Sequence, residues 1–189
     1  MIGIREQLTQ SVRRLIDVTI RSEADDAVVA RALALVDQTV DLLSTRLMPG
    51  SFGVRTNSEG ANIVWGNVAV GLRNAIAPPL IIEHDEVGGV RADVHLGAGY
   101  EGPPGHVHGG MCALILDHVL GATAHRPGKP AYTGTITVRY LRPTRLGALR
   151  AEARVERIDG SKTYATGHLR NADGVTVEAE GVFITPRYR

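Results

Sequence analysis

The chain has 189 residues, of which 43% are hydrophobic and 22% charged, and its formal net charge is +1. These values predict one soluble globular domain and exclude a strong charge-driven attraction to nucleic acid or an anionic membrane. The one cysteine, Cys112, excludes an intrachain disulfide and favours a reducing compartment. No apolar run reaches the ~18–20 residues of a membrane span, and no basic-then-apolar signal opens the chain. We therefore expect a cytoplasmic protein with no membrane span and no nucleic-acid partner.

Residues 1–48 predict an extension of two helices. Apolar residues recur at helical spacing in the first, and Ser22 with Asp25 resembles a capping box that opens the second. In the second helix an a/d seam needs a partner helix or an apolar surface, and it consists of Val29, Leu33, Val36, Val40, Leu43 and Leu47. We favour docking of this helical hairpin on its own domain. Dimerisation and a cover over a ligand tunnel are the alternatives.

Residues 49–79 predict a connecting segment that wraps the main domain. The helical pattern stops at Met48-Pro49-Gly50, and Gly, Asn, Ser and Pro are scattered through the segment. Within it, only Ile63 to Val70 could form a short strand.

Residues 80–189 predict an α+β domain. Apolar and polar residues alternate over 90–96, 134–141, 149–158, 163–170 and 175–184, as they do in strands with one wet face. Asp173-Gly174 marks the turn of a hairpin, and consecutive hairpins make an antiparallel sheet. Residues 110–124 are apolar nearly all round, which predicts a buried helix. The expected fold is an antiparallel sheet wrapped around one central helix.

The segment around the start of that helix carries the chemistry. The glycine pair Gly109-Gly110 leaves unpaired N–H groups where a ligand can approach the backbone, so both could donate to a developing oxyanion. Asp117 lies two turns on, in apolar surroundings. It is either a core acid bonded to His118 or to a sheet hydroxyl, or a reactive carboxylate. Eight helical residues rise ~12 Å, so Gly109 and Asp117 can act on one group only if they come from different subunits.

The residues of this segment resemble those of a known family. His108-Gly109-Gly110, followed by Asp117 and preceded by Gly102-Pro103-Pro104-Gly105, is similar to the PaaI-like hotdog-fold acyl-CoA thioesterases of the thioesterase superfamily. Tyr140-Leu141-Arg142-Pro143 resembles the strand-ending pattern of that family. The resemblance covers roughly residues 76–185.

The resemblance implies a hotdog fold and hydrolysis of an acyl-CoA thioester by a homodimer or a homotetramer built from two dimers, with the active site at the subunit interface. The backbone N–H of Gly109 would polarise the thioester carbonyl. Asp117 of the opposite subunit would attack it or activate a water, and Thr133, which falls on the family's active-site hydroxyl, would orient that water or the carboxylate. No cofactor is implied, since CoA is part of the substrate. Gly102 departs from the pattern, because some relatives carry Asn or Gln there.

Two histidines precede the helix. We expect His108 to hold the loop, although it could cap the helix or bond near the acyl carbonyl, and His106 could supply the polar contact that Gly102 lacks. Together with Gly110, His106 is expected to contact the substrate. His106 and His108 have no third ligand at a recognisable spacing, so we expect no metal.

Three further residues complete the expected site region. Arginine suits phosphate, so Arg142 or Arg145 is expected to touch the CoA nucleotide, although a solvated charged rim is as good an account. Cys112 lies inside the apolar helix and is expected to be a buried small hydrophobe.

Two other functions compete with thioester hydrolysis. A hotdog dehydratase or hydratase would use His106 or His108 with Asp117 as acid and base, but the Asp-x-x-x-x-His pattern of one hydratase branch is absent, and the dehydratase branch usually has Glu on the helix. A non-catalytic acyl-CoA-binding module is disfavoured by the intact Asp117.

Overall fold

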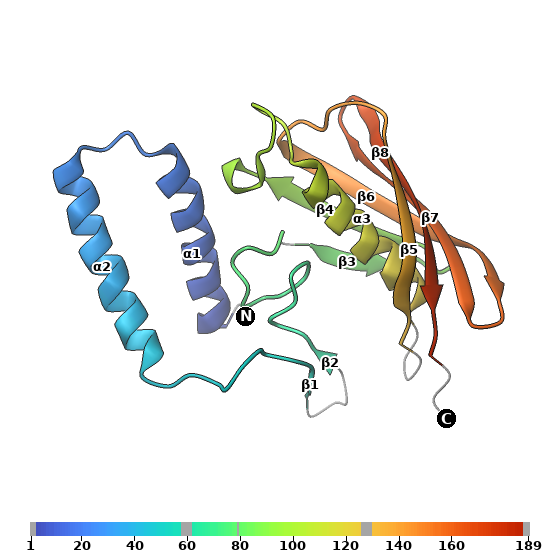
Figure 1. The fold of residues 1–189 in the computed structure, drawn as a ribbon, viewed down its shortest axis with the longest axis horizontal. Coiled ribbons are helices and arrows are strands. Elements are labelled where there is room, and N and C mark those ends of the chain that lie inside the picture. Colours follow the sequence, from blue (N-terminus) through green and yellow to red (C-terminus); the bar gives the residue numbers. More distant parts are fainter. Residues whose placement is uncertain (1–2, 58–61, 79, 126–129, 187–189) are drawn as a thin grey trace.

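The computed structural model describes residues 3–57, 62–78, 80–125 and 130–186. Two long helices come first, followed by a mixed region in which one central helix interrupts a series of strands (Figure 1). In chain order the elements are α1 (Ile4–Arg21), α2 (Asp26–Ser44), β1 (Arg55–Thr56), β2 (Asn62–Ile63), β3 (Ile81–His84), β4 (Val90–Leu96), the 3-10 turn η1 (Ala98–Tyr100), α3 (Gly109–Ala124), β5 (Tyr132–Tyr140), β6 (Gly147–Asp159), β7 (Lys162–Asn171) and β8 (Gly174–Ile184).

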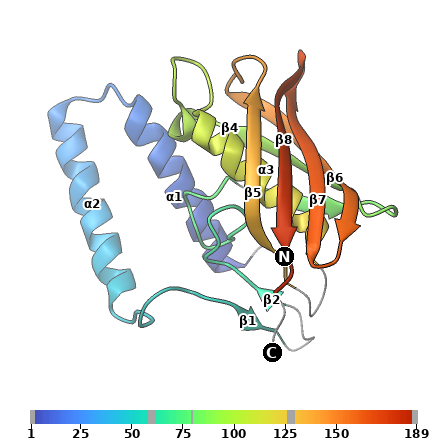
Figure 2. The ribbon, with the colours of Figure 1, turned by 45° about the vertical axis from the view of Figure 1, so that its right-hand side comes forward.

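Six of the strands form one sheet with the order β3-β4-β6-β7-β8-β5, and every neighbouring pair is antiparallel. The sheet curves around α3, which lies against one of its faces (Figures 1 and 2). The α+β class predicted from the sequence is confirmed. The predicted hairpin turn is confirmed too, because Asn171 pairs with Gly174 across a two-residue loop.

The core lies between α3 and the sheet. Ile115, Leu116, Val119 and Leu120 of α3 are fully buried. The sheet accepts the helix closely because small residues lie beneath it, and a Cβ added at Gly167 would lie 2.7 Å from a methyl group of Leu120. Burial of these side chains supplies the main driving force for the fold.

Strand β5 is one edge of the sheet and contains a bulge. The register shifts between Thr133, which pairs with Phe183, and Thr135, which pairs with Val182. Because side chains alternate along a strand, the extra residue, Gly134, moves Thr133 to the face of β5 that Phe183 shares, towards α3. A Cβ at Gly134 would lie 2.8 Å from Cδ1 of Ile184, so a larger residue in the bulge would have to displace the end of that side chain.

The helical extension is only half docked. Helix α1 packs against the segment after β4, where Ile16 lies beside Gly99, and against the connecting segment, where an Nη of Arg13 donates to the carbonyl of Asn74 at 3.2 Å; Thr9 of α1 is buried. No residue of α2 is buried. The expected docking of the whole hairpin on its own domain is therefore wrong for α2.

The start of α2 also differs from the expectation. Asp25, and not Ser22, is the N-cap, because the Asp25 carboxylate accepts a hydrogen bond from the Val28 N–H at 2.9 Å. Ser22 instead ends α1, and its hydroxyl accepts from the Ala24 N–H.

The connecting segment holds less strand than predicted. Among its described residues, Asn62 and Ile63 pair with Arg55 and Thr56 as two short strands, and the chain then runs through turns to residue 77. Asn67 organises these turns, since its side chain accepts from the Ala69 N–H at 2.8 Å. The short edge strand β3 was not recognised from the sequence.

Candidate active site

The start of α3 leaves one backbone donor without a partner. His108 is the N-cap, and its Nδ1 accepts from the Gly110 N–H at 3.0 Å. The His108 carbonyl accepts from Met111 at 2.9 Å and from Cys112 at 3.3 Å. Among the described residues, nothing accepts a hydrogen bond from the Gly109 N–H. Of the two glycines predicted as donors, Gly109 is therefore the one that is available.

The peptide unit that carries this donor is strongly polarised. Its carbonyl, that of His108, accepts two hydrogen bonds, and such bonds strengthen the donor at the other end of the same peptide. The N-terminus of a helix adds a partial positive charge at the same place. His108 thus caps the helix, which was the alternative to the expected loop-holding role, and its Nδ1 is the accepting ring atom.

Tyr140 holds Gly109 from the other side, and sequence reasoning missed it. Its hydroxyl donates to the Gly109 carbonyl at 2.9 Å, and its ring lies 3.4 Å from where a Cβ of Gly109 would stand. Desolvation raises the pKa of Tyr140, which keeps the phenol protonated and able to donate. The one signal in the sequence for this role was the position of Tyr140 at the end of a predicted strand, three residues before Pro143.

Asp117 and Thr133 meet, as the resemblance implied. The Thr133 hydroxyl donates to Oδ1 of Asp117 at 2.8 Å, and the carboxylate is half-buried. This contact depends on the bulge at Gly134, which turns Thr133 towards α3. The neighbouring His118 is also half-buried, and burial lowers its pKa while the charge of Asp117 opposes that shift.

One stripe of α3 is not covered within the chain. The sequence predicts a buried helix, yet only one side of α3 is buried, and partial exposure runs along the other through Gly110, Ala113, Leu114, Asp117 and Gly121. The adjacent strand β5 is mostly exposed and has an unpaired edge. The stripe and the edge together form a continuous open surface beside the candidate site.

A cavity of about 430 Å³ opens at the start of α3. The Cys112 thiol lines it, but the residue is 1% exposed and burial raises its pKa, so it is the small hydrophobe that was expected and not an activated nucleophile. The cavity is lined by Pro103, His106, Val107, Gly109, Cys112, Tyr140, Leu141, Arg142, Pro143 and Thr144.

The loop before α3 explains why residue 102 is glycine. A Cβ there would lie 2.7 Å from Cα of His108, so an Asn or Gln at this position would displace the helix cap. Nδ1 of His106 donates to the Pro104 carbonyl at 2.8 Å, which leaves Nε2 as the ring atom open to a ligand.

The two arginines predicted to contact CoA differ in whether the guanidinium is already held by hydrogen bonds. The Arg142 guanidinium donates to the carbonyls of Val175 and Asp173 at 2.9 and 2.6 Å, so it holds the β7–β8 turn. Arg145 is exposed and lies opposite His106 in an isolated bridge.

A larger hollow of about 1,100 Å³ lies on the face of the sheet away from α3. Charged side chains line it, including Glu152, which contacts His168 at 2.9 Å, and it contains no residue of the predicted site. Within the part of the chain that the structure describes, no helix is long and apolar enough to span a membrane.

This geometry defines a hotdog fold with a polarised backbone donor and an oriented carboxylate. Comparisons with known proteins agree. The thioesterase superfamily family model matches residues 104–178. The crystal structure of protein RHA08564, a thioesterase superfamily protein, is 34% identical, covers 96% of this chain and 91% of its own, and superposes with a TM-score of 0.85. The chain belongs to the thioesterase superfamily.

Other relatives match a smaller share of the chain. A putative thioesterase from Ralstonia eutropha, described as phenylacetic acid degradation-related, is 25% identical, with 56% of this chain and 84% of its own covered and a TM-score of 0.53. Acyl-coenzyme A thioesterase THEM4 of Xenopus laevis is 36% identical over 44% of this chain and 39% of its own length. THEM5 of Mus musculus is 31% identical over 44% and 35%. The chain thus matches less than half the length of these curated relatives.

Proposed function

We propose that the protein hydrolyses an acyl-CoA thioester to a free acid and CoA. The observation that carries the proposal is the polarised, unpartnered Gly109 N–H on the same helix as a carboxylate held by Thr133. The named activity of the THEM4 and THEM5 relatives supports it.

The Gly109 N–H and the Asp117 carboxylate, together with a water molecule, are sufficient for this hydrolysis. The thioester carbonyl oxygen accepts from the Gly109 N–H, which stabilises the negative charge that develops on it. Asp117 either takes a proton from a water whose oxygen attacks the carbonyl carbon, or attacks that carbon itself and forms an anhydride that water then opens. In both routes the C–S bond breaks and CoA leaves as a thiolate, which needs little acid assistance.

The active site is built from two copies of the chain. Gly109 and Asp117 are ~12 Å apart along α3, too far for one carbonyl. If two copies pair antiparallel along the exposed edge of β5, their α3 helices run antiparallel and Gly109 of one copy approaches Asp117 of the other. The same pairing covers the open stripe of α3. We therefore infer a homodimer as the unit of activity.

The CoA nucleotide binds beside the cavity at the start of α3. Arg145 is the better candidate for its phosphates, because Arg142 already holds the β7–β8 turn. His106 and Gly110 contact the pantetheine or the acyl group.

Release of free thiol from a panel of acyl-CoA esters tests the reaction. Wild-type protein should release thiol, and Asp117→Ala and Asp117→Asn should not, because Asn keeps a bond to Thr133 but neither accepts a proton nor attacks. Binding of the esters without thiol release would refute hydrolysis and favour a non-catalytic binding module. Loss of the double-bond absorbance of an enoyl-CoA would favour a hydratase.

A mixing experiment tests the two-copy site. Gly109→Pro removes the donor, yet proline is tolerated at the first helical position, and His108 has the φ of −59° and ψ of 132° that a residue before proline adopts. Gly109→Ala, which keeps the N–H, is the control. Inactive Gly109→Pro and inactive Asp117→Asn, once refolded together, should recover about a quarter of the wild-type sites, since half the dimers are mixed and each has one intact site. No recovery would mean that each site lies within one chain.

A further inference from the structure

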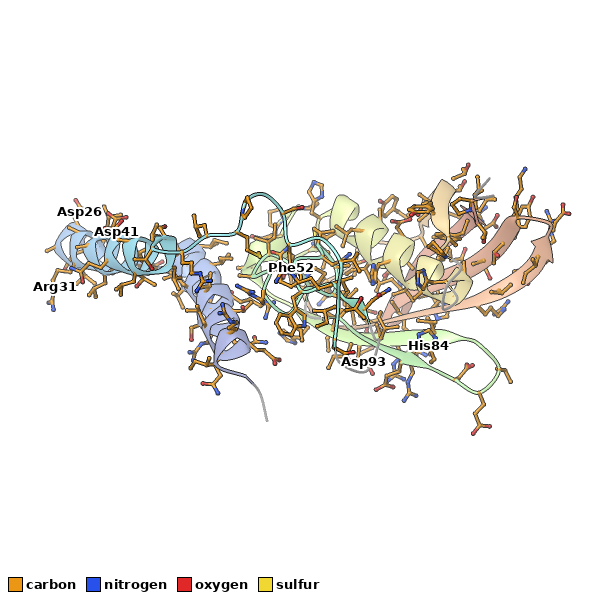
Figure 3. All side chains as sticks on the ribbon, turned by 90° about the horizontal axis from the view of Figure 1, so that it is seen from below. Asp26, Arg31, Asp41, Phe52, His84 and Asp93 are labelled. Carbon is orange, nitrogen blue, oxygen red and sulfur yellow. The ribbon has the colours of Figure 1, made fainter. Side chains whose placement is uncertain are left out.

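Helix α2 carries an apolar seam that is mostly exposed among the residues that the structure describes. Its helical residues Val29, Leu33, Val40 and Leu43 are between 50% and 60% exposed and Val36 is half-buried, while Leu47 lies beyond the end of α2 at Ser44. Figure 3 shows α2 at one end of the molecule, apart from the sheet, with its side chains directed into open space. The seam is therefore unpartnered and is not a marginal contact with the domain.

The spacing of the seam selects a helix as its partner. From Val29 to Leu43, with Val36 included, the seam residues step by 4, 3, 4 and 3 positions, which is the 3.5-residue period of helices that pack along each other. A second stripe, formed by Val28, Leu35 and Leu42, is also exposed. The small residues Ala32 and Thr39 separate it from the seam on the helix surface. The apolar arc is as wide as that of a helix in a bundle.

The charges on α2 argue against a lipid surface as the occupant. Helices that lie on membranes carry mainly Lys and Arg on the polar face. On α2 the acidic side chains Asp26, Asp37 and Asp41 outnumber the one basic side chain, Arg31. An anionic membrane would repel this face.

The area of the seam fits a contact between two copies. At their observed exposure, the seam residues of α2 together with the second stripe offer more than roughly 500 Å² of apolar surface per copy. Two copies would then bury about 1,000 Å², which is where specific interfaces begin. A two-fold axis would pair the same seam on both copies, so no second kind of surface is required.

The extension is a shared structural feature. The superposition with RHA08564 covers 96% of this chain and so includes α1 and α2, whereas the match to the Ralstonia eutropha protein covers 56%. The extension is thus an addition to the domain that carries the candidate site, found in a solved relative with the same overall arrangement.

We propose that α2 pairs along its seam with α2 of a second copy of this chain. The pairing is an assembly contact additional to the β5 edge and does not depend on the proposed reaction. It gives the outlying helix the core that it lacks within one chain.

Disulfide trapping tests the pairing directly. In the full chain, the double variant Val36→Cys/Val40→Cys puts thiols on the seam, where either a parallel or an antiparallel pair brings two of them together. The matched control, Ala34→Cys/Gln38→Cys, has the same spacing on the opposite side of the helix, and Cys112 is buried and does not compete. Under mild oxidation the seam variant should form a covalent dimer and the control should not. Equal crosslinking of both, or of neither, would overturn the proposal.

Sedimentation provides a second measurement. Leu33→Glu/Leu43→Glu places charges in the seam and should raise the dissociation constant of the assembly at least tenfold, whereas Gln38→Glu should leave it unchanged. Both variants should keep the wild-type circular dichroism of the sheet, because α2 is not part of the core. An unchanged dissociation constant for the seam variant would contradict pairing through α2.

Discussion

The hydrogen bond from Thr133 to Asp117 offers the sharpest test of the candidate site. Thr133→Val removes the hydroxyl and keeps the shape of the side chain. A hydrogen bond to a charged acceptor is worth ~1.5–3 kcal/mol, and because Thr133 is exposed and Asp117 only half-buried, solvent weakens this bond and we expect about 1–2 kcal/mol. If the bond orients the carboxylate in the transition state, kcat for thiol release should fall ~5–30-fold with little change in KM.

Two variants on the same strand make the test specific. Thr133→Ser keeps the donor and should retain most of the wild-type kcat. Thr135→Val changes the same kind of side chain on the other side of the bulge, facing away from α3, and should have no effect. A wild-type kcat in Thr133→Val would refute the reasoning, as would an equal loss in both valine variants.

Three further predictions concern the neighbourhood of the site. Tyr140→Phe removes the donor to the Gly109 carbonyl, and steady-state thiol release should show kcat lowered several-fold with KM nearly constant; a change in KM alone would contradict a positioning role. Gly102→Ala places a Cβ 2.7 Å from Cα of His108 and should lower the free energy of unfolding by ~1–3 kcal/mol, measured in urea, and an unaltered midpoint would show that the loop yields freely. Burial holds the pKa of His118 below its ordinary 6.5, so the unfolded chain takes up a proton first as the pH falls. Stability should therefore be fully present above pH 6.5 and decline below it, a slope that His118→Gln should reduce in urea titrations across pH.

Much of the fold could be predicted because its periodicity is local. Strands β4 and β6 to β8 alternate between one wet and one buried face, and α3 is apolar enough to be recognised as the central helix. The docking of α2 could not be predicted in the same way. Its seam is plain in the sequence, but periodicity says that a helix needs a partner and not whether that partner belongs to the same chain.

The sequence could identify which residues belong to the candidate site, but it could not predict how they contact one another. The alternation along β5 gives Thr133 the same face as Thr135, and only the bulge at Gly134 separates them, a feature that depends on pairing with β8. The contact of Tyr140 with Gly109 joins residues 31 positions apart, and no local pattern reports it. Gly102 departs from the Asn or Gln that some relatives carry. The reason is the close approach of His108, which is a tertiary contact and leaves no mark in the local sequence.

The two hydrogen bonds between β5 and α3 have a mechanical consequence. Tyr140 attaches the strand to the first residue of the helix, and Thr133 attaches it two turns further along. A helix fixed at two points can neither slide along the strand nor turn about its own axis, since a rotation by one residue, ~100°, would break both attachments. In each copy, β5 thus fixes both the backbone donor that the chain gives to one site and the carboxylate that it gives to the other. Pairing of two copies along the β5 edge would carry both groups to the interface on the same strand.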